Sequence, residues 1–192
     1  MQLKTITAVS TEPVTLSEVK AHLRVDSILD DTLITSLITV AREYIENFTK
    51  RALATQTLEL ILDSFPNAEY IDLPLSPLQS VTSVKYKDSS GNETTLGSSG
   101  YIVNTDFLPG KIILAYGCSW PTFTPYPTGA IRIKYVAGHE TNNPVPISIK
   151  QAMLLLIGHL YENREATNIK ELKEVPFAVN ALLYPYKILG WC

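Results

Sequence analysis

The stretch TLSEVKAHLRVDSILDDTLITSLITVAREYIENFTKRAL, residues 15–53, decides the fold because it holds the strongest periodic pattern in the chain. Thr15 and Glu18 stand three apart, the spacing of a capping box, which predicts that a helix begins there. Asp30 and Asp31 suit the electropositive N-terminus of a second helix. The apolar stripe of that helix is Leu33, Ile34, Leu37, Ile38, Ala41, Tyr44, Ile45 and Phe48. The pattern predicts two amphipathic helices joined by a short turn.

Two helices joined by a turn are also the outline of a DNA-binding helix-turn-helix. A helix that reads DNA presents Lys, Arg, Asn or Gln on its exposed face, because these side chains contact phosphates and base edges. Residues 15–53 hold five Lys and Arg against six Asp and Glu. The second helix opens on two aspartates, where a recognition helix meets the phosphates. The sequence therefore favours a helical hairpin that packs on protein, with DNA reading as the alternative.

Composition sets the outer limits of the protein class. The chain has 192 residues, 45% hydrophobic and 18% charged, with a formal net charge of -3 and a pI near 5.6. This length supports one globular domain, or one with a sizeable insertion. The sequence has no apolar run long enough to span a membrane, and its first residues do not resemble a signal peptide. We expect a protein made in the cytoplasm, with Cys118 and Cys192 as free thiols.

The spacing of apolar residues changes from a helical to a strand-like pattern after residue 54. Residues 56–62 alternate apolar and polar side chains, as a strand does. Residues 81–87 and 93–96 flank the turn SSGN, which predicts a hairpin, and YIVNT, KIILAY and AIRIKYVAG are further strand candidates. Residues 55–143 are therefore predicted to form a β-rich insertion.

A helical sequence pattern begins again after Pro144 and Pro146. The segment ISIKQAMLLLIGHLYE is apolar around most of its circumference, which predicts a buried core helix. We therefore predict an α+β fold: a helical bundle made of the N-terminal helical hairpin plus C-terminal helices, with a central β-rich insertion. The helical body would comprise residues 1–54 and 144–192.

Catalytic chemistry finds little support in the sequence. His22, His139 and His159 stand near no serine or cysteine motif of a hydrolase. His159 and Glu162 have the spacing of two ligands on one helical turn, but a single pair does not make a di-metal site. The sequence contains no phosphate-binding glycine loop, CxxC or dinucleotide fingerprint. We expect no enzyme activity, and no catalytic, cofactor-binding or metal-binding residues.

The C-terminal tail is the candidate partner-binding segment. Its last sixteen residues contain eight large apolar or aromatic side chains: Phe177, Leu182, Leu183, Tyr184, Tyr186, Ile188, Leu189 and Trp191. One interpretation is that the tail covers the subunit's own core. The other is that Phe177, Leu182, Leu183, Tyr184, Tyr186 and Trp191 bind a partner, since aromatic residues dominate binding hot spots.

Six blocks, in this order along the chain, resemble a known family: EPVTLSEVKAHLRVD, DDTLITSLITVAREYIENFTKRAL, LPLSPLQSVTSVKY, AYGCSWP, IRIKYVAGH and PISIKQAMLLLIGHLYENREA. Together they are similar to the head-tail connector (adaptor) proteins of tailed phages and prophages. Each block alone is a packing motif with no reactive centre. The tail NALLYPYKILGWC departs from the family and matches no portal-docking segment residue by residue.

The resemblance implies a structural role in the virion, at the portal vertex and head–tail interface. It implies a homo-oligomeric ring of about a dozen copies that joins the portal protein to a tail-completion or tail-terminator protein. Double-stranded DNA would pass through the channel without sequence-specific binding, and no membrane is involved. The alternative is a phage DNA-binding or DNA-packaging-associated protein that uses the N-terminal hairpin, which a salt-dependent gel shift would reveal. A hydrolase, revealed by any turnover, is a third interpretation.

Overall fold

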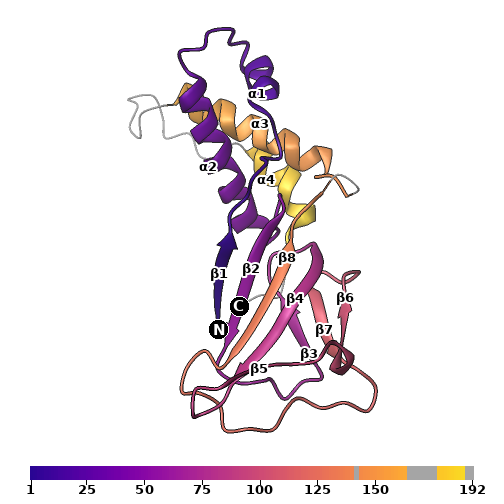
Figure 1. Ribbon diagram of the computed structural model, residues 1–192. Helices are drawn as coiled ribbons and strands as arrows, with labels where there is room; N and C mark the ends of the chain where they lie inside the picture. The colour runs from indigo at the N-terminus through magenta and orange to yellow at the C-terminus, as the bar shows by residue number, and fades with distance from the viewer. Residues whose placement is uncertain (141–142, 164–176, 189–192) are drawn as a thin grey trace. The chain divides into compact units, whose positions relative to one another are not determined.

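The computed structural model describes residues 1–140, 143–163 and 177–188 (Figure 1). The chain divides into two compact units, one formed by Met1–Ser10 with Thr55–His139 and the other by Thr11–Ala54 with Glu140–Cys192. Helices lie in the second unit and antiparallel sheets in the first. The predicted α+β class is confirmed.

The helical unit contains α1 (Leu16–Leu23), α2 (Asp31–Thr49), α3 (Ile147–Glu162), α4 (Phe177–Leu183) and a 3₁₀ turn, η2 (Tyr184–Tyr186). The predicted capping box starts α1, because the backbone N–H of Thr15 donates to Glu18 Oε2 at 2.6 Å and that of Glu18 donates to Thr15 Oγ1 at 3.2 Å. The first hydrogen bond in particular lowers the pKa of Glu18. α1 ends at Arg24 and α2 at Lys50, and the backbone of each of these residues adopts the left-handed helical conformation.

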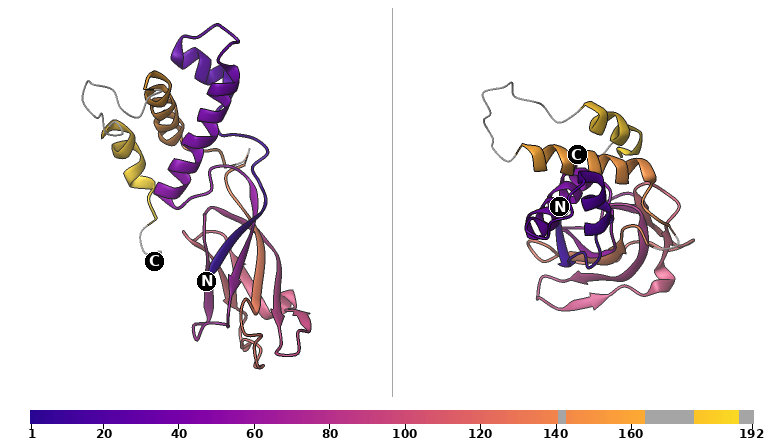
Figure 2. Two further views of the ribbon diagram at one scale, coloured as in Figure 1. Left: turned by 90° about the vertical axis from the view of Figure 1, so that its left-hand side faces the viewer. Right: turned by 90° about the horizontal axis from the view of Figure 1, so that it is seen from above.

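The core of the helical unit is built from one face of each helix. Figure 2 shows α3 lying between α2 and α4. The buried side chains are Val14, Val19, Ile34, Ile38, Ala41, Ile45, Leu53, Val145, Ile149, Ala152, Met153, Leu156, Ile157, Val179 and Leu183. Full burial of one Leu or Ile side chain contributes about 1.5–3 kcal/mol, so these contacts hold the helices together.

The β unit contains two sheets and a 3₁₀ turn, η1 (Ser98–Gly100). The five-stranded sheet has the order β1-β2-β8-β4-β5 and the three-stranded sheet the order β3-β7-β6. The strands are β1 (Gln2–Thr7), β2 (Gln56–Leu62), β3 (Tyr70–Leu73), β4 (Leu78–Lys87), β5 (Glu93–Thr95), β6 (Tyr101–Asn104), β7 (Gly110–Leu114) and β8 (Ile131–Ala137). The pairing of β4 with β5 is the predicted hairpin.

Alternation along the strands separates a buried face from an outer face in the five-stranded sheet. Leu58 and Leu60 of β2 and Ile133 of β8 are fully buried. Their neighbours along the strands, Glu59, Arg132 and Lys134, face outward. Tyr135 is also fully buried, and its hydroxyl donates to the Pro74 carbonyl at 2.8 Å. Burial raises the pKa of this hydroxyl, so it remains a donor at physiological pH.

The strand β1 is an element that sequence patterning did not reveal. It pairs antiparallel with β2, from Gln2 opposite Ile61 to Thr7 opposite Thr57. Residues 1–10 therefore group with the strands, whereas the sequence prediction grouped residues 1–54 with the helices. The segment has too few apolar residues for a clear alternation, and its partner strand lies about fifty residues away.

Replacing Gly110 by Ala should destabilise the β unit. A Cβ at this position in β7 would lie 2.4 Å from the Leu78 Cβ of β4, where the two sheets approach each other. Overpacking of this kind costs about 1–3 kcal/mol. Urea unfolding measures the effect, with Gly97→Ala as the control, because a Cβ there meets its nearest atom at 3.8 Å. Equal unfolding free energies for the two variants would contradict this close approach.

Candidate partner-binding site

The structure separates the predicted partner-binding residues of the tail into buried and exposed groups. Leu183 is fully buried, whereas Phe177 is 86% and Tyr184 is 68% exposed. Leu182 and Tyr186 are partly buried and pack against the helical core. Trp191 lies outside the described residues. The two interpretations of the tail therefore apply to different side chains.

The segment after α4 is anchored to the C-terminal end of α2. Arg51 Nε donates to the Tyr186 carbonyl at 2.7 Å, and the backbone N–H of Ile188 donates to the Thr49 carbonyl at 3.0 Å. Burial lowers the pKa of Arg51 below its usual range. Lys187 Nζ lies 5.1 Å from the ring centroid of Phe48. These contacts hold Tyr184 in a defined place on the surface.

A second exposed apolar feature is the loop between α1 and α2. Ile28 is 77% and Leu29 is 89% exposed. The loop is held at its base, because Lys20 Nζ lies 2.6 Å from Asp31 Oδ1 and the Tyr161 hydroxyl donates to Asp30. We name Ile28 and Leu29 the loop tip. Helical periodicity does not reveal it, although an apolar pair outside the helical stripe, between Ser27 and Asp30, is a recognisable signal.

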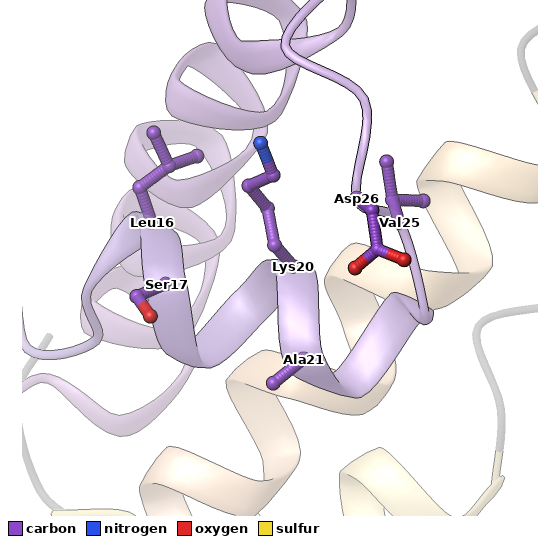
Figure 3. Close-up of a pocket in the computed structure, with 6 residues that line it drawn as sticks. All are labelled: Leu16, Ser17, Lys20, Ala21, Val25 and Asp26. Atoms are coloured by element: carbon purple, nitrogen blue, oxygen red, sulfur yellow. The ribbon is translucent and has the colours of Figure 1, made fainter.

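An open pocket of about 580 Å³ lies along α1 and the start of this loop (Figure 3). It is lined by Leu16, Ser17, Lys20, Ala21, Val25 and Asp26. Lys20 is bound to Asp31, and no histidine or cysteine lines the pocket. The lining mixes polar and apolar side chains and contains no nucleophile paired with a base.

A buried ion network fastens α2 to the segments on either side of the hairpin. Arg42 Nη1 lies 2.8 Å from Glu46 Oε2, and Arg42 Nε lies 2.9 Å from Glu12 Oε2. The backbone N–H of Leu53 donates to Glu46 Oε1 at 2.8 Å. Burial opposes the charge on Arg42, but Glu46 and Glu12 outweigh it and raise the pKa of Arg42. Burial raises the pKa of Glu46, against the opposing effects of Leu53 and Arg42.

The three histidines do not form a site. His22 lies on α1, His159 near the end of α3, and His139 after β8 in the other unit. Asn163 Nδ2 donates to the His159 carbonyl at 2.8 Å, which caps the end of α3. Within the described ranges, no group of three or more His, Cys, Asp and Glu is placed to hold a metal ion. In the same part of the chain, no helix is long and apolar enough to cross a membrane.

The exposed face of α2 does not resemble a DNA-reading surface. Its outward positions in the first three turns include Thr32, Thr35, Ser36 and Val40, which carry no charge. Arg42 is 8% exposed and is bound by carboxylates. The geometry gives no support to the alternative of DNA reading by the N-terminal hairpin.

Solved structures similar to this chain come from gene transfer agent particles. The chain in the neck of an empty particle, computed with C6 symmetry, is 25% identical with a TM-score of 0.82, and the match covers 100% of this chain and 98% of that chain. The chain in the virion of the native particle is 26% identical with a TM-score of 0.80 and the same coverage. The chain in the neck of the native particle, computed with C12 symmetry, is 25% identical with a TM-score of 0.80, again over 100% and 98%.

A comparison with curated proteins finds no match. A comparison with models of protein families matches residues 13–109, just over half of the chain, to the phage gp6-like head-tail connector proteins. The matched region includes the helical hairpin and most of the strands. The chain therefore belongs to the phage gp6-like head-tail connector protein family.

Proposed function

We propose that this connector forms a closed ring of about a dozen copies at the head–tail junction of a tailed phage or prophage particle. The observation that carries the proposal is the likeness, over 100% of this chain, to chains in particle necks computed with C6 and C12 symmetry. A subunit with the same fold over its whole length can present equivalent surfaces to its neighbours. In this proposal residues 1–54 and 144–192, which hold the helices and β1, form the ring body, and residues 55–143 form an insertion in it.

A ring of more than two copies needs two different surfaces on each subunit, because its contacts run head to tail. The helical unit offers separate exposed apolar features, namely the loop tip at Ile28 and Leu29 and the tail surface at Phe177 and Tyr184. Exposed apolar patches in a protein of mixed surface charge mark partner contacts. These features support assembly with other protein chains.

We assign the contact with the portal protein to the tail, with Phe177 and Tyr184 as the side chains that bind. Leu182 and Tyr186 support them from the core, and Leu183 serves only the core. Aromatic side chains bring large contact areas and dominate binding hot spots. A tail-completion protein would bind the opposite end of the ring, and duplex DNA would pass through the channel without sequence-specific contacts. The role is structural and requires no catalysis.

The experiment that tests this function measures the mass of the purified protein alone and mixed with its portal ring. Native mass spectrometry or light scattering should find a complex that contains both proteins. A chain that stays monomeric in the mixture, or that is absent from purified particles, would refute the connector role. A salt-dependent gel shift at the hairpin would instead support the DNA-binding alternative.

The double substitution Phe177→Ser and Tyr184→Ser should abolish capture by the portal ring while leaving thermal melting nearly unchanged. Both side chains are exposed, so their replacement should change the free energy of unfolding of the subunit very little. Loss of two aromatic anchors weakens binding roughly tenfold or more. Deleting the tail from Tyr184 is a poorer test, because it also removes Ile188, which is 9% exposed.

Ile147→Ser is the matched control for this prediction. Ile147 is 85% exposed at the start of α3, so its replacement removes an exposed apolar side chain outside the tail. Portal capture should remain in this variant. Undiminished capture by the Phe177→Ser, Tyr184→Ser protein would remove the tail from the portal contact.

A further inference from the structure

The outer face of the five-stranded sheet is unusually basic for this chain. Strand register places five cations on it: Lys4, Lys85, Lys87, Arg132 and Lys134. Within these strands the same face holds two carboxylates, Glu59 and Glu93, so its formal charge is +3. Because the whole chain carries -3, the other residues together carry -6. We call the five cations the basic face.

Register, and not sequence proximity, brings these cations together. Lys4 of β1 lies opposite Glu59 of β2, which lies opposite Lys134 of β8. Arg132 of β8 lies opposite Lys85 of β4. Neighbouring strands are about 4.8 Å apart, so these side chains form one continuous surface. β1, β2, β8, β4 and β5 lie in this order in the sheet, and β1 and β8 lie on either side of β2 in Figure 1.

The two carboxylates do not neutralise the basic face. Glu93 pairs with Lys85 at 2.7 Å, and Glu59 pairs with Arg132 at 3.5 Å. Lys4, Lys87 and Lys134 form no ion pair with any other described residue, and Lys87 Nζ lies 4.1 Å from the Tyr126 ring centroid. The hydrogen bond from Lys85 chiefly lowers the pKa of Glu93, and the charges of Lys85, Arg132 and Lys87 lower it further.

The face also holds hydroxyl side chains that suit phosphate, beside the apolar Ile61 and Val136. Thr57, Ser83 and Thr95 lie on it and carry hydroxyl donors. Lys, Arg, Ser and Thr supply most side-chain contacts to the DNA backbone, and such contacts carry no sequence information. Sequence-independent binding through phosphates is weak, roughly 10⁻⁴ to 10⁻⁶ M at physiological salt, and permits sliding.

We propose that the basic face contacts the phosphate backbone of the duplex DNA that passes through the connector. The proposal rests on the proposed function, because the DNA must lie in the channel of the ring. It assigns the DNA contact to the β unit and away from the N-terminal hairpin. An ordinary solvated sheet face mixes charges of both signs, whereas a polyanion ligand explains the excess of cations and the unpaired lysines.

Photo-crosslinking in DNA-filled particles tests which molecule covers the basic face. Ser83→p-benzoylphenylalanine places the probe at the centre of the face, opposite Lys134. Ile102→p-benzoylphenylalanine, on the three-stranded sheet and 57% exposed, is the matched control. The proposal expects DNA crosslinks from position 83 and none from position 102. Crosslinks from 83 to a neighbouring subunit or another protein would overturn it.

The salt dependence of DNA binding by the isolated ring gives a second test. The Lys87→Gln, Lys134→Gln variant should lower the slope of log affinity against log salt for a random-sequence duplex by about two. The control Lys50→Gln, Lys150→Gln removes the same charge from the helical unit and should leave the slope unchanged. Thermal melting checks that each variant is folded.

The outcomes distinguish a failure of the DNA contact from a failure of the connector function. Equal slopes for the two double variants, or a ring that binds no duplex at low salt, would overturn the DNA contact. If the unsubstituted chain forms no ring and is absent from particles, the connector function itself fails. If the chain is present in particles but position 83 gives no DNA crosslink, only the DNA contact fails.

Discussion

Replacing Ile38 by Asp should unfold the protein at room temperature. Ile38 lies on the buried stripe of α2, is 3% exposed, and packs in the core of the helical unit. An unpaired carboxylate in this surrounding costs several kcal/mol, out of a total stability of roughly 5–15 kcal/mol. Far-ultraviolet circular dichroism and urea unfolding measure the loss.

Val40→Asp is the matched control on the same helix. Val40 is 50% exposed, so its replacement should change the unfolding free energy by no more than about 0.5 kcal/mol. Leu37 is only partly buried, so Leu37→Asp should lower the unfolding free energy by an amount between those of the other two variants. A cooperatively melting Ile38→Asp protein with normal stability would contradict the packing of α2.

Replacing Arg42 by Met should produce the second-largest loss of stability, about 3–5 kcal/mol at pH 7. The substitution keeps much of the side-chain volume and removes the guanidinium that lies 2.8 Å from Glu46 and 2.9 Å from Glu12. Glu46 is then a buried carboxylate that has lost its ion pair with Arg42. Chemical unfolding measures the difference, and Glu43→Gln is the control, because the Glu43 side chain is 62% exposed.

The loss caused by Arg42→Met should become smaller as the pH falls. Burial raises the pKa of Glu46 above its ordinary value of 4.5, and removing Arg42 raises it further. Below the pKa that Glu46 has in the unfolded chain, its carboxyl is protonated in both the folded and the unfolded state and needs no cation. As the pH rises from about 4.5 towards the raised folded pKa, the folded state must ionise a buried group, and stability is lost. A loss that is independent of pH between 4.5 and 7 would contradict this role for Glu46.

The elements that follow from local chemistry were predictable. Thr15 and Glu18 form a capping box within four residues, and the stripe of α2 repeats along one helix, so neither depends on distant chain. The hairpin of β4 and β5 also follows from a turn between adjacent strands. The family resemblance rested on such locally determined blocks and agrees with the family match over residues 13–109.

The exposed residues of the candidate binding site could not be predicted in this way, because the exposure of a side chain depends on which other parts of the chain cover it. The sequence shows that the tail is apolar, but it cannot separate Leu183, which is fully buried, from Tyr184, which is 68% exposed. That difference arises because the segment after α4 is held against α2 by Arg51 and Thr49, more than 130 residues earlier.

The sequence by itself determined the α+β class, the helical hairpin, the β-rich middle and the connector family. Only the tertiary structure decided that residues 2–7 are a strand, which tail side chains face outward, and that Lys4, Lys85 and Arg132 share one sheet face. Helix caps and apolar stripes act over a few residues, so they can be read from local spacing. Strand order and register join distant segments, and they alone determine which charges become neighbours.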